Sequence, residues 1–199
     1  MTAKEFLEKH ILKRAEIIPD EVRRAFTPAQ QLQMTLTGKD GGIFTLYWDS
    51  GDFKMREGKA ETPVLHMETV TRGFLDLMTG KYSEFVDISK LGEGSSFVVD
   101  PIAMLSPKKL DVIKNVKGTL CIQYCDGPTP NDDILSEAFM AFNGEEMDKE
   151  EPRCTVIMPI GKLERIAKGE VTPPQLMMAG GMRVIGDMQM VIQMSPLLR

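Results

Sequence analysis

The residues able to do acid–base or nucleophilic chemistry are few and scattered in this sequence. Its two histidines are His10, beside an apolar helical stripe, and His66, in the middle of a strand-like run. Neither has a serine, cysteine or carboxylate at a spacing that predicts a catalytic pair. We therefore interpret both as structural histidines.

The thiols and carboxylates lead to the same conclusion. The 3 cysteines, an odd number, argue against a disulfide framework, and Cys121 and Cys125 share one face of a strand. With 2 histidines in the chain, a zinc site would lack ligands. The carboxylate-rich run 144–151 is polar throughout, so nothing there would raise a carboxyl pKa. We predict buried, inert thiols, a solvated turn, no metal, no cofactor and no enzymatic activity.

Composition excludes several classes of partner. The chain has 199 residues, 42% of them hydrophobic, and a net charge of −5 without a basic stripe, which argues against nucleic-acid binding. No apolar run reaches membrane-spanning length and the N-terminus lacks a signal-peptide core, so we expect a cytoplasmic protein. A helix opened by Thr2-x-x-Glu5 carries Lys9 and Lys13, which leaves transient membrane contact open; its glutamates favour packing on a sheet instead.

Methionine is the unusual feature, with 15 residues. Its unbranched, polarizable side chain fills irregular gaps and suits surfaces that accept varied apolar shapes. Two interpretations stay open at this point: a methionine-rich core that binds nothing, and the wall of a ligand cavity. Composition alone favours the closed core.

The C-terminal region has the clearest pattern of elements. A short β-rich run, 154–158, is followed by a helix over 163–168 that ends at Gly169. Two prolines open a second short helix over 173–178. Residues 182–194 alternate and predict one strand with a glycine in its middle.

This order resembles the C-terminal half of the sterol carrier protein 2 family of nonspecific lipid-transfer proteins. The resemblance rests on the strand 154–158, the helix ending at Gly169, the Pro173-Pro174 opening, the adjacent Met177 and Met178, and the signature Gly180-x-Met182-x-Val184-x-Gly186-Asp187-Met188. It implies an α+β fold, with a mixed, mainly antiparallel sheet covered by helices.

The N-terminal part predicts a second set of similar elements. We expect strands over 43–48, 53–56 and 64–67, then a helix carrying Phe74 and Leu77 that stops at Gly80. A short helix from Pro28 to Met34 and a helical face formed by Ile134, Ala138 and Phe142 are also predicted. Between them, Gly92-x-Gly94 lacks the Lys-Ser/Thr of a phosphate loop.

The two sets predict a partial internal duplication. Residues 64–67 align with 155–158, and the helix ending at Gly80 aligns with the one ending at Gly169. We expect a first unit over 1–125 with N-terminal helices and a shorter second unit over 118–199. In this interpretation the strand 118–125 serves both units, so two small sheets join or abut in one compact body.

The resemblance implies that the chain binds and carries a lipid or another apolar small molecule between sheet and helices. The residues it implicates are Phe74, Leu77, Leu163, Ile166, Met177, Met178, Met182, Val184, Met188 and Met190. The alternative is an accessory module with a closed core that forms a homodimer or binds an enzyme partner.

Overall fold

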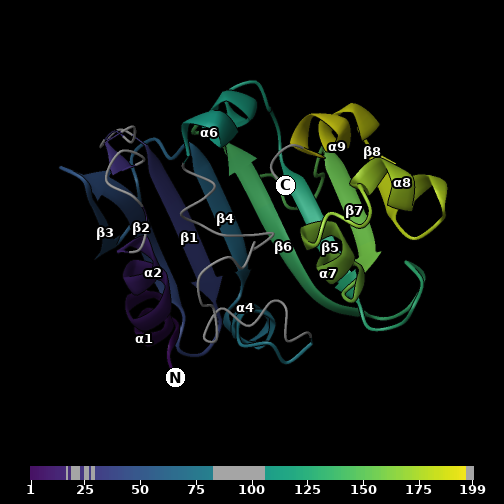
Figure 1. The fold of residues 1–199 in the computed structure, drawn as a ribbon, viewed down its shortest axis with the longest axis horizontal. Helices are drawn as coiled ribbons and strands as arrows, with labels where there is room; N and C mark the ends of the chain where they lie inside the picture. The colour runs from purple at the N-terminus through teal and green to yellow at the C-terminus, as the bar shows by residue number, and fades with distance from the viewer. Residues whose placement is uncertain (17, 19–22, 25–26, 28–29, 83–105, 196–199) are drawn as a thin grey trace.

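The computed structural model of the chain describes residues 1–16, 18, 23–24, 27, 30–82 and 106–195. Its strands form one eight-stranded sheet in the order β3-β2-β1-β4-β6-β5-β7-β8 (Figure 1). The strands are β1 (Gln31–Thr37), β2 (Gly42–Asp49), β3 (Asp52–Glu57), β4 (Leu65–Val70), β5 (Leu120–Cys125), β6 (Ile134–Phe142), β7 (Cys154–Pro159) and β8 (Arg183–Gly186).

The sheet is mixed and mainly antiparallel, which confirms the predicted fold class. Five neighbouring pairs are antiparallel, and the pairs β1·β4 and β5·β7 are parallel. Because β6 is antiparallel to both β4 and β5, the strands β1, β4, β5 and β7 all run in one direction. Their carboxyl ends therefore meet at one edge of the sheet.

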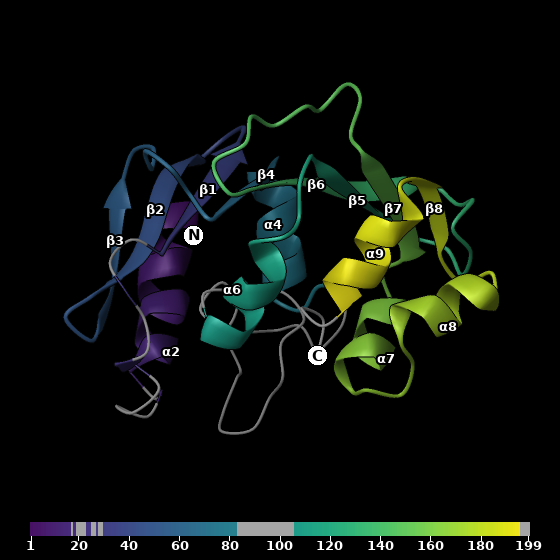
Figure 2. The ribbon, with the colours of Figure 1, turned by 90° about the horizontal axis from the view of Figure 1, so that it is seen from above.

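The described helices lie on one face of this sheet (Figure 2). Strand alternation turns apolar side chains of every strand toward them, such as Met34 of β1, Met67 of β4 and Val156 of β7, all buried. The helical segments are α1 (Ala3–Phe6), η1 (Leu7–Leu12), α2 (Lys13–Ala15), α4 (Thr71–Met78), α6 (Pro107–Ile113), α7 (Lys162–Ala167), α8 (Pro173–Met178) and α9 (Met188–Met194).

The opposite face is mixed, with Glu68 of β4 beside Phe139 of β6, and the connection from β6 to β7, residues 143–153, passes over part of it in Figure 2. Lys149 of this connection pairs with Glu68 of β4 at 2.7 Å, and the Asp148 backbone N–H donates to Thr119 Oγ1 at 2.8 Å. The connection thus ties the N-terminal and C-terminal strands together on the side without helices.

Several predicted elements are confirmed. The capping box of Thr2 and Glu5 opens the first helix, whose described part reaches Ala15. The hairpin β2–β3, the strand β4 and the helix α4 lie where the sequence predicts them. The irregular stretch with Gly92 lies outside the described residues.

Three predictions were wrong because pairing in the sheet overrides local pattern. Residues 31–34 belong to β1, not to a helix, since they pair with both β2 and β4. Residues 134–142 form β6, not a helical face, because Ala138, Met140 and Phe142 also satisfy the alternation of a strand. Residues 182–194 are not one strand: β8 ends at Gly186 and α9 follows, with the Asp187 side chain accepting from the Gln189 backbone N–H at 2.9 Å.

A fourth correction concerns the strand that joins the two halves. Residues 120–125 form β5, which pairs with β6 and β7 and is not a neighbour of β4. The strand between the N-terminal four strands and the rest is β6. The division into units over 1–125 and 118–199 stays a prediction.

We expect Gly186 to be the least replaceable of the glycines at the C-terminal end. Its φ is +89°, and a Cβ there would lie 2.4 Å from the backbone oxygen of Arg153. Gly186→Ala should lower the free energy of unfolding by about 3 kcal/mol, since strain and a backbone clash add. Gly169→Ala is the matched control, with φ +70° but no atom within 4 Å; it should cost about 1 kcal/mol. Urea unfolding of both variants measures the difference, and equal losses would contradict it.

Candidate functional site

Helix α4 follows β4 directly and turns back over the helix side of the sheet. Its buried residues Phe74 and Met78 are four apart and so lie on one helix face. The Phe74 ring packs edge-on against Phe6 of α1, with ring centroids 5.6 Å apart. Gly73 allows close approach to the sheet, because a Cβ at this position would lie 2.4 Å from Ser136 Oγ of β6.

A small hollow of about 30 Å³ lies between α4 and the sheet, and we call it the α4 hollow. Its walls come from α4 and from the strands β4, β5 and β6, and none of the described residues that line it is charged. The lining residues are Met67, Thr69, Gly73, Phe74, Leu77, Met78, Tyr124, Ser136, Ala138 and Met140. Three methionines in so small a wall make it deformable, because each can change rotamer without losing apolar contact.

Three hydroxyl groups belong to this otherwise apolar wall, those of Thr69, Tyr124 and Ser136. Tyr124 of β5 and Ser136 of β6 stand directly opposite each other in the strand register. Tyr124 is 5% exposed, and burial raises the pKa of its hydroxyl. It therefore stays protonated and can donate a hydrogen bond.

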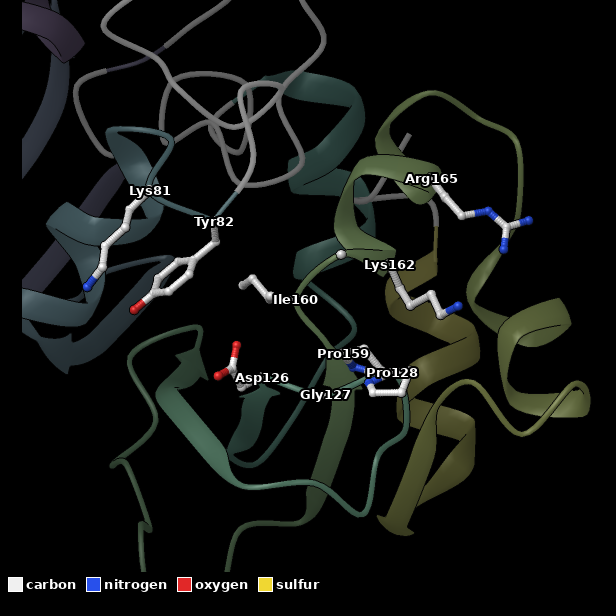
Figure 3. A pocket seen from close by; sticks show the side chains of 10 residues that line it. Lys81, Tyr82, Asp126, Gly127, Pro128, Pro159, Ile160, Lys162 and Arg165 are labelled. Carbon is white, nitrogen blue, oxygen red and sulfur yellow. The ribbon is translucent and has the colours of Figure 1, made fainter.

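A larger, open pocket of about 540 Å³ lies at the carboxyl ends of β5 and β7, and we call it the end pocket. Figure 3 shows Tyr82, Ile160 and Asp126 around its centre, with Lys162 and Arg165 of α7 on one side and Lys81 on the other. Pro128 and Pro159 add apolar surface. Both pockets are bounded by residues near the C-terminal end of α4 and by the end of β5.

The thiols offer no nucleophile. Cys121, Cys125 and Cys154 are free and buried, as predicted. Burial raises the pKa of Cys121 and of Cys154 to about 11, so both remain thiols at neutral pH. No group of three or more histidine, cysteine or carboxylate side chains in the described part of the chain could hold a metal ion.

A sequence profile described as the SCP-2 sterol transfer family matches residues 101–199. The chain belongs to this family. Lipid binding is therefore its general class of function, and nothing in the family match points to catalysis. No curated protein matches the sequence significantly.

Three solved structures are similar to this SCP-2 family chain. Sterol carrier protein 2 from Yarrowia lipolytica is 13% identical over 44% of this chain and 71% of its own, with a TM-score of 0.34. Sterol carrier protein domain 2 of Helicoverpa armigera is 17% identical over 54% of this chain and 91% of its own, with a TM-score of 0.36. A UbiJ-SCP2 ubiquinone synthesis protein is 9% identical over 98% of this chain and 87% of its own, with a TM-score of 0.27. Scores this low carry no inference about function.

The predicted ligand-binding residues of this family member fall into separate places. Phe74 and Leu77 line the α4 hollow. Leu163 and Ile166 of α7, together with Met182 and Met190, are buried in the core, and Val184 and Met177 are half-buried. Met178 is 86% exposed and Met188 is 47% exposed, so the structure places both at the surface.

The sequence reasoning missed the residues that give the pockets their polarity. Tyr124 falls in the run 120–125, which it treated as a shared strand, and Ser136 falls in a segment predicted to be a helix. Lys162 directly precedes the predicted helix over 163–168. Only the neighbour relation of β5 and β6 brings Tyr124 and Ser136 together, and no spacing in the sequence shows it.

His66 lies on the sheet face opposite the hollow, in a polar network. Its Nε2 lies 2.9 Å from Thr35 Oγ1 and 3.0 Å from Gln33 Nε2. Gln33 is fixed in this orientation because its Oε1 accepts the Ala60 backbone N–H at 3.0 Å. The His66 Nε2 must therefore accept from the Gln33 amide, and a proton on it would place two donors face to face.

We expect this network to make folding sensitive to pH. Burial lowers the pKa of His66 below its ordinary value of 6.5, Lys59 and Lys149 act in the same direction, and Glu68 opposes them. The unfolded state then binds more protons than the folded state. The contribution of His66 to the free energy of unfolding is therefore complete above about pH 6.5 and falls as the pH drops through the lower folded-state pKa. Urea unfolding between pH 8 and 5 should show this loss, and His66→Gln should flatten the slope. An unchanged slope in His66→Gln would refute the assignment.

Proposed function

We propose that this SCP-2 family chain binds an apolar ligand in the α4 hollow and shields it from water without any covalent step. One observation carries the proposal: a hollow with methionine-rich, uncharged walls lies between the sheet and a covering helix, and Phe74 and Leu77 line it. The family resemblance implicated both residues for the same reason. Fatty acyl and sterol-like lipids are the ligand class we favour.

The energetics do not require specific polar recognition. Burial of an acyl chain contributes about 0.8 kcal/mol per methylene. At about 30 Å³, however, the α4 hollow is too small to hold an acyl chain as it stands. Entry of an acyl chain into the hollow therefore requires Met67, Met78 and Met140 to repack and α4 to move away from the sheet.

We propose the buried residues of α7 and α9 as a second wall available to a longer ligand. Leu163 and Ile166 face the sheet from α7, while Met182 and Met190 pack into the same core. Val184 of β8 packs against this core from the edge of the sheet. Met177, Met178 and Met188 would contribute only if the C-terminal helices moved.

A second candidate function is an accessory or self-associating module, and the C-terminal surface favours it. Ile185 is 53% exposed on the edge strand β8, and Met178, Met188 and Ile192 are exposed on the neighbouring helices. Such apolar exposure beside an unpaired strand edge is typical of protein contacts. Sedimentation equilibrium distinguishes the candidates, because a stable dimer weakened by Ile185→Lys, in a chain that binds no lipid, supports the module.

Filling the α4 hollow should weaken ligand binding. Leu77→Trp places a larger side chain in it and should weaken binding of a fluorescent fatty acyl probe by about tenfold or more, or about 1.4 kcal/mol. Displacement by unlabelled fatty acid or sterol shows that binding is saturable. The matched control is Leu135→Trp, since Leu135 is 36% exposed in β6 and does not line the hollow. Equal affinities of the folded variants would remove the α4 hollow as the site.

A further inference from the structure

The end pocket has the size of a ligand site and shares no lining residue with the α4 hollow. Its volume of about 540 Å³ falls in the range of small-molecule pockets. It lies where β5 and β7 end, at the edge of the sheet that the four strands running in one direction share. Ile160, which is 8% exposed, forms an apolar centre with Tyr82 and Asp126 beside it (Figure 3). The proposed ligand of the α4 hollow makes no use of this pocket.

Two of the three cations in the described lining of the end pocket already have partners. Lys81 Nζ lies 2.6 Å from Asp76 Oδ2 and 5.2 Å from the centroid of the Tyr82 ring. Arg165 Nε lies 3.4 Å from Glu170 Oε2. Because Asp76 and Glu170 are not part of the lining, they offset these two positive charges without occupying the pocket.

One charge of each sign remains in the lining. The Lys162 ammonium and the Asp126 carboxylate make no hydrogen bond or ion pair with any other residue that the structure describes. Figure 3 shows these two side chains on opposite sides of Ile160. An anionic ligand would be repelled by Asp126, and a cationic ligand would be repelled by Lys162. A molecule that carries both charges can pair with both side chains.

We infer that the end pocket is a second binding site, which takes a zwitterionic small molecule with an apolar body. The ammonium of this ligand pairs with Asp126 and its carboxylate pairs with Lys162. Its methylenes lie over Ile160 and the Tyr82 ring, and two prolines of the lining extend this apolar surface. The site is separate from the α4 hollow, so the inference does not rest on the proposed function.

A purely anionic ligand is the competing class, because cations outnumber carboxylates in the described lining. The two classes respond to Asp126 in opposite ways. An anion would bind through Lys162 and Arg165, and removal of the Asp126 charge would strengthen its binding. A zwitterion loses its ammonium partner on the same change, so its binding would weaken.

The test compares three compounds that share a six-carbon chain: the zwitterion ε-aminocaproate, the anion caproate and the cation hexylamine. Each is titrated into the isotope-labelled full chain, and NMR follows the backbone amide signals of Gly127 and Gly161, which line the end pocket. We expect ε-aminocaproate to bind about threefold more tightly than either analogue, since each exposed ion pair contributes modestly. The amide signal of Gly73, in the α4 hollow, should stay unchanged.

Two variants test the two charges separately. Asp126→Asn should weaken binding of ε-aminocaproate about threefold and strengthen that of caproate. Lys162→Met should weaken both of these compounds and spare hexylamine. The matched controls are Asp133→Asn, in the same loop as Asp126, and Lys108→Met of α6. Both side chains are exposed and outside the lining, so these changes should leave all three affinities unaltered.

Several results would overturn the inference. These are caproate binding as tightly as ε-aminocaproate, tighter binding of ε-aminocaproate by Asp126→Asn, and no shift of Gly127 and Gly161 with any compound. Leu77→Trp separates the two sites, because ε-aminocaproate should bind this variant as it binds the wild type. Loss of binding there would assign the zwitterion to the α4 hollow and overturn the inference. Failure of the fluorescent acyl probe to bind the wild type would remove the proposed function alone.

Discussion

The pairing of β6 with two neighbours is the constraint on which the rest of the structure depends. β6 is antiparallel to β4 through Ala138–Phe142 and to β5 through most of its length. Without it, the N-terminal strands and the C-terminal strands would be two small sheets, each with an open edge. Because β6 runs antiparallel to both β4 and β5, those two strands point in the same direction. Helix α4 and the loop after β5 consequently begin at the same edge, and the end pocket lies there (Figure 3).

This arrangement also determines what kind of binding the chain can offer. Apolar side chains pack the helices against the sheet, and Gly73 of α4 allows close approach to Ser136 of β6. The wall beneath α4 is rich in methionine, and its residues Tyr124 and Ser136 come from adjacent strands at one register position. In the proposed function, an apolar ligand would be accommodated by repacking of these side chains.

Much of the fold could be predicted from the sequence, and the errors have a common physical cause. Turn glycines, the capping box at Thr2 and the alternation of β2 and β7 are local signals, and they were sufficient. β1 and β6 were mistaken for helices because their apolar spacing suits either structure until a neighbour pairs with them. Phe74 and Leu77 were predicted through a resemblance, and both line the α4 hollow. Tyr124 and Ser136 were missed, since only the sheet brings these distant residues together.

The order antiparallel, parallel, antiparallel occurs twice, over β2-β1-β4-β6 and β6-β5-β7-β8. It agrees with the predicted duplication, which stays a prediction.

The connection 143–153, on the sheet face without helices, bears on how a ligand could enter. The pair Lys149–Glu68 and the bond from Asp148 to Thr119 fasten that side across β4 and β5. Both contacts lie on the side of the sheet without helices (Figure 2). Ligand entry beneath α4, as proposed, would therefore leave them intact.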